Sequence, residues 1–352
     1  MTVAAATLER RAAETSRKRT LSELVDRAGH RTLLLGSSKD PNAKVTMLLL
    51  PPAGDAPVFA VKIPTTAVAE RAVEAEVSVL RRLHGNGLAV VADTIPRVVE
   101  LVEHRGRTAL VTNALSGVPL SRLYVERRHT GSARLVARDF AVVGEWLRRF
   151  QDATATVSGP ETRTRIADTI RERFADDTGA AADAVQVAEL EAKVSAQASA
   201  QARIGTAVHG DFWFGNVLVC NDCVTGVVDW EAAAVCGDPT RDVVRFALSY
   251  ALYLDRRTRR DKRVRGHDGL VAGRWGTGVE LAFDGSGWFP ELFRGFVRDG
   301  LAHAGAEPAA WREHVLVGIA EVAATADDPA FAARHLELFR RLARRPVWRA
   351  PE

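Results

Sequence analysis

Three polar side chains flank a short apolar hairpin in the middle of the chain. Asp211 and Asn216 lie in the segment VHGDFWFGNVL, and Asp229 lies further on in GVVDWE. The two apolar runs between them are separated by NDCVT, which predicts a β-hairpin. With the turn centred between Asp222 and Cys223, Asn216 lies opposite Asp229, with their Cα atoms roughly 5 Å apart. The loop that begins at Asp211 then brings all three side chains together.

These residue types favour magnesium and a phosphate over other metal chemistry. An amide oxygen and a carboxylate suit Mg²⁺, which takes one or two hard oxygen ligands from a protein and leaves room for phosphates and water. A second carboxylate nearby can accept the proton of an attacking hydroxyl group. The constellation therefore predicts phosphoryl transfer, in which positioning and charge neutralisation supply most of the catalysis. The alternative is a hairpin whose polar ends only cap a loop.

The same segments resemble a known family. HGDFWFGN and VVDWE match the H-G-D-x-x-x-x-N and I-D-W-E signatures of the aminoglycoside phosphotransferase and choline kinase-like family, relatives of protein kinases. The resemblance extends over about residues 30–250. It implies that Asp211 is the catalytic base, that Asn216 and Asp229 bind Mg²⁺, and that His209 supports the loop.

Two further segments fit the resemblance. GDPTRD resembles the family's G-D-P-x-x-D, which implies that Asp242 hydrogen-bonds the backbone of the loop that carries Asp211; a simple helix cap is the alternative. Lys62 stands in the apolar strand VFAVKI, where an unpaired charge is costly to bury. The resemblance implies that Lys62 contacts the α- and β-phosphates and that Glu76, in EVSVL, is its partner. Otherwise Lys62 stands at the frayed end of an edge strand.

The remaining nucleotide contacts are less specific. The loop GSSKDP between the first two strands would cover the phosphates, with Ser37 and Ser38 as candidates, although an ordinary hairpin loop fits equally well. Alignment with the family's hinge implies that the Asn113 carbonyl and the Leu115 amide contact a purine. Backbone contacts leave both ATP and GTP open as donors.

The elements that position these residues fall into two groups. The expected strands are 31–36, 44–50, 58–63, 97–103 and 108–113, with a helix at 65–83. Beyond Ser116 the pattern is mostly helical, at 140–150, 165–175, 180–202 and from 242 onward, interrupted by a β-like stretch at 206–230. We therefore predict an α+β, two-lobed protein-kinase-like fold. Residues 1–115, with a leading helix at 20–28, form a small antiparallel-sheet lobe that binds nucleotide, and 116–352 form a larger helical lobe for catalysis and substrate binding.

Composition excludes several other classes. The chain has 352 residues, 47% hydrophobic, with a net charge of +4, so nothing in the overall charge favours a nucleic-acid partner. No apolar run is long enough to span a membrane, and the N-terminal residues lack a signal-peptide pattern. Three cysteines cannot form a disulfide framework. These features predict a cytoplasmic protein, whose oligomeric state stays open.

Three other segments allow more than one interpretation. Cys220 and Cys223 form a C-x-x-C pair, which could bind zinc or act in redox chemistry but more simply flanks the turn. The basic run at 255–265 could be a solvated surface, an RNA contact or a border of the acceptor site. The aromatic residues of 266–290 could form a flap over the acceptor or a packed surface excursion.

The sequence as a whole predicts a Mg²⁺-dependent O-phosphotransferase. It would move the γ-phosphate of ATP or GTP to a hydroxyl of a small molecule, an antibiotic or other natural product. The basic run favours a neutral or anionic acceptor over a polycationic one. The alternatives are a metabolic kinase for a sugar, choline or amino-alcohol, and a catalytically silent nucleotide-binding protein.

Overall fold

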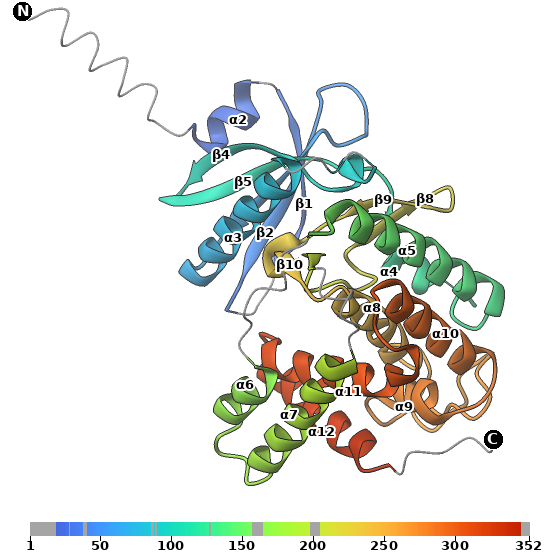
Figure 1. Cartoon of the computed structure of the whole chain (residues 1–352). Coiled ribbons are helices and arrows are strands. Elements are labelled where there is room, and N and C mark those ends of the chain that lie inside the picture. The colour runs from blue at the N-terminus through green and yellow to red at the C-terminus, as the bar shows by residue number, and fades with distance from the viewer. Residues whose placement is uncertain are drawn as a thin grey trace, which may run out of the picture. The chain divides into compact units, whose positions relative to one another are not determined.

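The computed structural model describes the chain in two compact units (Figure 1). The described residues are 19–27, 29–37, 41–85, 88, 90–126, 128–156, 165–197 and 205–345. The smaller unit comprises the chain up to Arg81 together with Pro96–Ala114, and the larger unit comprises Arg82–Ile95 and the chain from Leu115 onward. Helix α3 (Ala67–Gly85) begins in the smaller unit and ends in the larger one.

The smaller unit is built on an antiparallel sheet with the strand order β1-β2-β3-β5-β4. Its strands are β1 (Arg31–Ser37), β2 (Lys44–Leu50), β3 (Phe59–Pro64), β4 (Val98–His104) and β5 (Arg107–Asn113). Helix α2 (Leu21–Arg27) precedes them, and Thr20 with Glu23 forms a capping box, in which each side chain bonds the other residue's backbone amide.

Alternation along β3 separates the two faces of this sheet. Val61 and Ile63 face a core that also contains Leu21 and Leu24 of α2. Because successive side chains of a strand point to opposite faces, Lys62 faces the other side, where it contacts α3. The expected lysine is therefore placed by strand geometry against the helix that carries Glu76.

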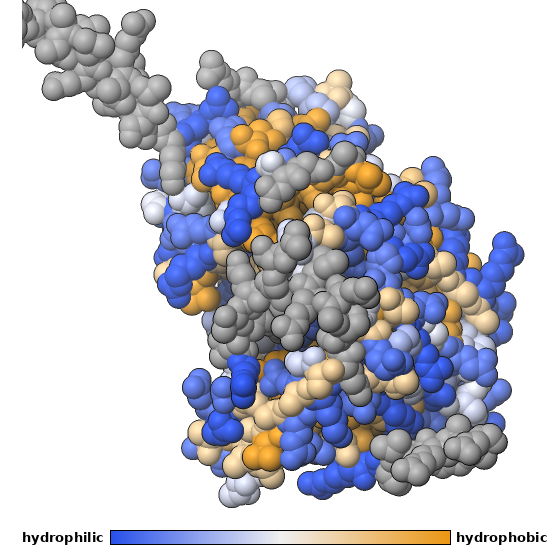
Figure 2. All heavy atoms as spheres, viewed as in Figure 1, coloured by the Kyte–Doolittle hydropathy of each residue, from blue (hydrophilic) through white to orange (hydrophobic). Residues whose placement is uncertain are grey.

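The outer strand β1 is unusually apolar on its exposed surface. Leu33, Leu34 and Leu35 are 50%, 65% and 58% exposed, and orange hydrophobic residues gather over this unit in Figure 2. A register irregularity between Leu34 and Gly36 indicates that Leu35 is an extra residue in the pairing with β2.

The larger unit is mainly helical, as the sequence predicts. Its helices are α4 (Leu120–Tyr124), α5 (Ala133–Thr154), α6 (Ile166–Arg173), α7 (Ala180–Gln197), α8 (Thr240–Leu252), α9 (Thr277–Asp284), α10 (Trp288–His303), α11 (Trp311–Thr325) and α12 (Pro329–Ala343), with short 3₁₀ turns η1 (Ala92–Thr94), η2 (Trp230–Ala232) and η3 (Pro308–Ala310). None of the helices in the described part of the chain combines the length and hydropathy of a membrane-spanning segment.

Short strands interrupt these helices between α7 and α8. They are β7 (Thr206–Val208), β8 (Val217–Cys220), β9 (Cys223–Val227) and β10 (Ala234–Gly237), with β6 (Val118–Pro119) pairing with β8. Aromatic rings of α5 and α8 pack edge-on to one another in a core in which Phe140, Phe246 and Tyr250 are fully buried. This core supports the loop between β7 and β8, residues 209–216, which we call the HGD loop.

Candidate active site

The HGD loop is held by a buried carboxylate on α8. The two oxygens of Asp242 accept hydrogen bonds from the backbone amides of His209, at 2.7 Å, and Gly210, at 2.9 Å. Asp242 lies in the first turn of α8, where Pro239 occupies the cap position, so its side chain supports the loop instead of capping its own helix. Burial raises the pKa of the Asp242 carboxyl above its ordinary value, whereas His209 and the two amide hydrogen bonds act in the opposite direction.

His209 holds the loop from the inside. Its ring is fully buried between Phe212 and Trp230. Nδ1 accepts a hydrogen bond from the backbone amide of Asp211 at 3.3 Å, and Nε2 lies 2.9 Å from the carbonyl oxygen of Val228. One ring nitrogen therefore binds the backbone of the loop itself, and the other binds Val228, the residue that follows β9.

Asp211 and Asn216 lie side by side in the HGD loop. The Asn216 amide nitrogen donates to the backbone carbonyl of Asp211 at 3.0 Å and lies 3.5 Å from Asp211 Oδ2. Asn216 is buried, at 7% exposed, whereas the side chain of Asp211 remains 36% exposed. Because the amide nitrogen is used within the loop, the amide oxygen of Asn216 is the atom left to serve as a metal ligand.

The predicted register of the hairpin is wrong by one residue. Strands β8 and β9 pair Cys220 with Cys223, so the turn consists of Asn221 and Asp222, both in the left-handed conformation with φ of +48° and +63°. Positive φ at both turn residues is typical of a type I′ hairpin, which centres the turn earlier than we expected.

A register shift further along the hairpin determines which residue lies beside Asn216. Between Leu218 and Val219 the pairing shifts by one residue, and Thr225 on β9 is the extra residue. As a result the backbone carbonyl of Asn216 accepts a hydrogen bond from the amide of Val228 at 2.9 Å, so Asn216 is opposite Val228 and not Asp229.

Asp229 follows directly after the residue that bonds Asn216. Its backbone has φ of +73° and ψ of +62°, a left-handed conformation that is uncommon for residues other than glycine, although Asn and Asp adopt it more often than most, and it leads into η2. Strain of this kind at a non-glycine residue is often retained at functional sites. The carboxylate of Asp229 and the amide oxygen of Asn216 form an all-oxygen donor set, which fits Mg²⁺ and is a poor set for zinc.

One charged residue that lies at this site was not identified from the sequence. Arg245, one turn after Asp242 on α8, binds Asp211 Oδ1 through Nε at 3.1 Å and Nη2 at 2.6 Å. Its side chain is 24% exposed. The spacing of three residues from Asp242 places both side chains on one face of the helix, and this spacing was the available clue.

In the smaller unit, Lys62 and Glu76 form the expected ion pair. Lys62 Nζ lies 2.8 Å and 2.7 Å from the two carboxylate oxygens of Glu76. Their side chains are 16% and 2% exposed, so the carboxylate is almost entirely buried. Glu70 instead accepts hydrogen bonds from Arg107 and from the Thr108 amide, which distinguishes it from the residue that holds Lys62.

The other expected nucleotide contacts lie at the ends of strands. Ser37 is the last residue of β1 and pairs with Val45, so the strand extends one residue further than predicted. Ser38 lies outside the described residues. Asn113 ends β5, with its side-chain oxygen accepting from the Arg97 amide at 2.6 Å, and Leu115 follows in an irregular segment.

A family model decides the class of the protein. The model described as the phosphotransferase enzyme family matches residues 52–275, more than half of the chain. The chain belongs to this family. The predicted enzyme class, a phosphotransferase with an alcohol group as acceptor, is thereby confirmed, and no curated protein matches the sequence.

Solved structures agree with this phosphotransferase in fold. A thermostable mutant of aminoglycoside phosphotransferase APH(4)-Ia in its apo form is 17% identical with a TM-score of 0.54, covering 92% of this chain and 99% of that one. The streptomycin–ATP ternary complex of APH(2'')-IIa is 13% identical with a TM-score of 0.50, covering 91% and 94%. These similarities confirm the kinase-like fold, with its N-terminal antiparallel sheet and mainly helical remainder.

The basic run of this phosphotransferase begins beside the HGD loop. Residues 255–265 form a turn-rich segment whose basic side chains are exposed. The Arg256 guanidinium lies 5.1 Å from the ring centre of Tyr253, and that ring packs edge-on to Phe214 of the HGD loop at 5.8 Å. Burial raises the pKa of Tyr253, while the positive charges of Arg256 and Arg245 act in the opposite direction.

The aromatic stretch 266–290 is partly core, and the two cysteines of the C-x-x-C pair lie on the surface. Phe283 and Phe289, from the aromatic stretch 266–290, are buried, and α9 and the start of α10 lie within it, so this part of the stretch packs as core. Cys220 and Cys223 are exposed, free thiols flanking the type I′ turn.

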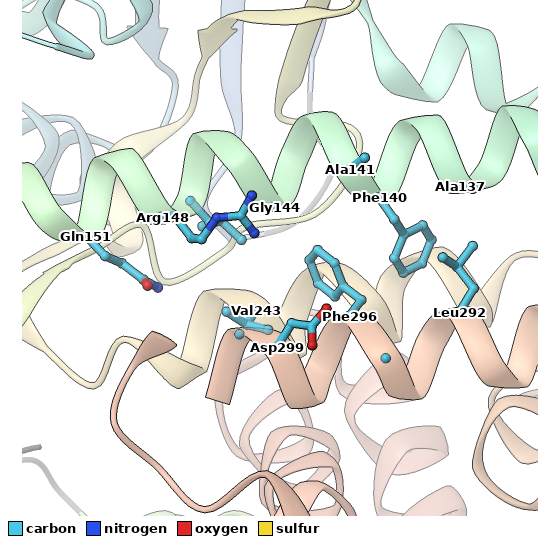
Figure 3. A pocket seen from close by; sticks show the side chains of 13 residues that line it. Ala137, Phe140, Ala141, Gly144, Arg148, Gln151, Val243, Leu292, Phe296 and Asp299 are labelled. Atoms are coloured by element: carbon cyan, nitrogen blue, oxygen red, sulfur yellow. The ribbon is translucent and has the colours of Figure 1, made fainter. Parts of the chain in front are cut away.

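A separate hollow of about 340 Å³ lies between α5, α8 and α10 (Figure 3). Phe140 and Phe296 form much of its apolar lining, with Arg148 and Asp299 as its charged residues. Because none of the HGD-loop residues lines it, this pocket is distinct from the arrangement around Asp211.

Proposed function

We propose that this protein is a Mg²⁺-dependent O-phosphotransferase that moves the γ-phosphate of ATP or GTP to a hydroxyl of a small molecule, an antibiotic or other natural product. The observation that carries the proposal is the HGD loop, in which Asp211 and Asn216 lie side by side. Asp242 and His209 hold the loop by hydrogen bonds to its backbone.

Each residue of the loop has a part in the proposed reaction. Asp211 accepts the proton of the acceptor hydroxyl as the hydroxyl oxygen attacks the γ-phosphorus. The bond from that phosphorus to the β–γ bridging oxygen breaks, so the products are a phosphomonoester, a nucleoside diphosphate and one proton. The exposed side of Asp211 supports this role, since a base must reach its substrate, whereas burial of Asn216 suits a fixed ligand.

Asn216 and Asp229 are the proposed magnesium ligands. Both offer hard oxygen atoms, and the hydrogen bonds of the Asn216 amide nitrogen turn its oxygen away from Asp211. When bound, Mg²⁺ supplies positive charge that offsets the charge of the β- and γ-phosphates.

In the smaller unit, Lys62 is proposed to bind the α- and β-phosphates. Its two short contacts with Glu76 fix the direction of an otherwise flexible side chain. Ser37, Ser38 and the backbone groups of Asn113 and Leu115 complete the proposed nucleotide contacts.

The charge of the basic segment supports a neutral or anionic acceptor. Arg256 contacts Tyr253, whose ring packs against Phe214 between Asp211 and Asn216 in the sequence. A polycationic acceptor near this segment would meet like charge, which lowers its affinity and its rate of encounter. The similar structures named above hold streptomycin or lack substrate, and at their low identity they support the fold and not that acceptor.

A phosphotransfer screen tests the proposal. MgATP and MgGTP are offered separately with aminoglycosides, nucleoside and peptide antibiotics, simple sugars and choline, and products are detected by mass spectrometry. We expect a phosphorylated product with the wild type and none with Asp211→Asn, which should still be stabilised thermally by nucleotide. Asp229→Ala should lose the magnesium-dependent part of that stabilisation.

Two outcomes would reject parts of the proposal. Equal turnover by wild type and Asp211→Asn removes Asp211 as the base, whereas nucleotide binding without any transfer favours a silent binding protein. For the acceptor, Arg256→Gln should change the acceptor KM, while Arg260→Gln, which alters an exposed side chain next to Asp261, should not. Equal effects of the two substitutions would reject a role for Arg256 in the acceptor site.

A further inference from the structure

Arg245 and Asp211 make the closest charged contact at the candidate site. The guanidinium approaches only one carboxylate oxygen, Oδ1, and does so with two of its nitrogens, at 3.1 Å and 2.6 Å. The other oxygen, Oδ2, has the long 3.5 Å approach of the Asn216 amide as its contact within the loop. The two oxygens of Asp211 are therefore in different environments.

This difference matters for a general base. A carboxylate oxygen that accepts two hydrogen bonds from a cation is a poor proton acceptor, and its orientation is fixed by the planar guanidinium fork. The oxygen without that contact keeps its lone pairs for an incoming hydroxyl. Since a small misplacement of a reacting group can cost about 100-fold in rate, holding Oδ1 also fixes where Oδ2 points.

We propose that Arg245 is a positioning residue, which binds Asp211 Oδ1 so that Oδ2 receives the proton of the acceptor hydroxyl. This inference rests on the proposed function, because it requires Asp211 to be the base. In the reaction the proton moves from the acceptor oxygen to Oδ2 while Arg245 keeps its protons and its bonds to Oδ1. Arg245 therefore stabilises the orientation of the base and takes no part in transfer itself.

The position of Arg245 on α8 gives this role a structural basis. Asp242, on the same helical face, holds the backbone of the HGD loop at His209 and Gly210. Arg245 holds the side chain of the next residue, Asp211. A single rigid helix thus fixes both the loop and the carboxylate that the loop presents, which is the arrangement expected for a preorganised base.

The test compares kinetic constants in single and double variants. Rates are measured with MgATP and with MgGTP, using the best acceptor from the screen and also water as acceptor. We expect Arg245→Ala to lower kcat about 10–100-fold while the nucleotide KM and the nucleotide-induced thermal shift change less than about twofold. Arg171→Ala, which removes an equal charge from the exposed surface of α6, should leave both constants near wild type.

The double variant with Asp211→Asn separates positioning from a direct contact. If Arg245 acts through Asp211, then Arg245→Ala should cause no further loss of the slow residual rate of Asp211→Asn, which lies below the detection limit of the screen and is measured in single turnovers at high enzyme concentration. Added guanidinium chloride, far below denaturing concentrations, should restore part of the rate to Arg245→Ala and none to the double variant. Arg245→Lys keeps the charge without the fork, so it should retain an intermediate rate and serves if Arg245→Ala folds poorly.

Specific outcomes overturn the inference. Arg245 does not position the base if Arg245→Ala leaves kcat unchanged or raises only the nucleotide KM. The same conclusion follows if Arg245→Ala lowers kcat by the same factor in the wild-type and the Asp211→Asn backgrounds. A wild type that binds nucleotide and transfers phosphate to neither water nor any acceptor overturns the proposed function, and the positioning role with it. An active wild type with an inactive Asp211→Asn and a fully active Arg245→Ala overturns the positioning role alone.

Discussion

Asp242 and Arg245 leave α8 three residues apart and reach successive residues of the HGD loop, one through its backbone and one through a side chain. Asp242 accepts hydrogen bonds from the amides of His209 and Gly210, and Arg245 donates to the carboxylate of Asp211. The buried carboxylate of Asp242 and the largely buried guanidinium of Arg245, on one helical face, thus set the conformation of the loop. The stability of the loop should therefore depend strongly on single atoms of these two side chains.

Replacing Asp242 by asparagine tests the backbone part of this arrangement. The asparagine side chain has only one acceptor oxygen. Its NH₂ group would therefore face one of the two backbone N–H groups that now donate to Asp242. We expect Asp242→Asn to lower the free energy of unfolding by about 2–4 kcal/mol and to abolish turnover. Urea denaturation measures the first effect. Asp299→Asn, an equivalent change at an exposed site, should stay within about 0.5 kcal/mol.

Gly210 and Gly269 form a matched pair for testing the tightness of the loop. Their φ angles are nearly equal, at +81° and +80°. A Cβ atom on Gly210 would lie 2.1 Å from the carbonyl oxygen of Ala232, whereas nothing lies within 4 Å of one on Gly269. Gly269→Ala should therefore cost only the strain of positive φ, about 1–2 kcal/mol.

Gly210→Ala carries the same strain and a backbone collision in addition. We expect a loss of stability clearly larger than that of Gly269→Ala, together with loss of phosphotransfer, measured by thermal denaturation and by product formation. Equal effects of the two substitutions would contradict the close approach of the HGD loop to Ala232.

Removing one partner of the Lys62–Glu76 ion pair should strongly lower the free energy of unfolding. Lys62→Met leaves a carboxylate of 2% exposure without its lysine, which should cost about 3–5 kcal/mol. Lys62→Met combined with Glu76→Met should recover much of this loss, because the buried carboxylate of Glu76 is then removed as well. The exposed Arg171–Asp168 pair is the control, and Arg171→Met should cost about 0–1 kcal/mol. A double variant less stable than Lys62→Met alone would contradict this account.

The buried side chain of His335 on α12 should make the free energy of unfolding depend on pH. Burial lowers its pKa from 6.5 to about 3, against the opposing effect of the hydrogen bond to the Phe331 carbonyl. The unfolded chain binds a proton below pH 6.5 and the folded chain only near pH 3, so acid favours the unfolded state in this window. The His335 contribution should fall by about 1.4 kcal/mol per pH unit below 6.5.

Comparison with His335→Leu isolates this contribution from the many carboxylates that also titrate. The stability difference between wild type and His335→Leu should move in favour of the variant as the pH falls from 6.5 towards 3. A pH-independent difference for His335→Leu would contradict burial of an uncharged ring.

The sheet of the smaller unit was predictable from sequence because its signals are local. Short apolar runs bounded by turn residues located β2 to the residue, and β3 and β5 to within one residue. The single lysine in the apolar run VFAVKI was the local signal for Lys62. These features depend on neighbours in the sequence, and they need no knowledge of distant packing.

The register of the β8–β9 hairpin and the contact of Arg245 were harder to predict from the sequence, for two different physical reasons. The sequence NDC allows the turn to be centred at either of two positions, so a two-residue type I′ turn and a wider turn could not be told apart. The extra residue Thr225 then shifts the register, and no glycine at that position signals the bulge. Arg245 lies in a helix whose arginines look like ordinary surface residues. Its partner, Asp211, is distant in sequence, so only the folded chain brings the two together.

The apolar outer strand β1 has a consequence for how the protein is handled. In the described part of the chain, β1 pairs with β2 on one side only, and its three successive leucines are exposed. An open edge that carries leucines is a template for strand addition from another molecule. Concentrated solutions should therefore tend toward sheet-mediated self-association that leaves phosphotransfer intact, and a lysine in place of Leu34 should suppress it.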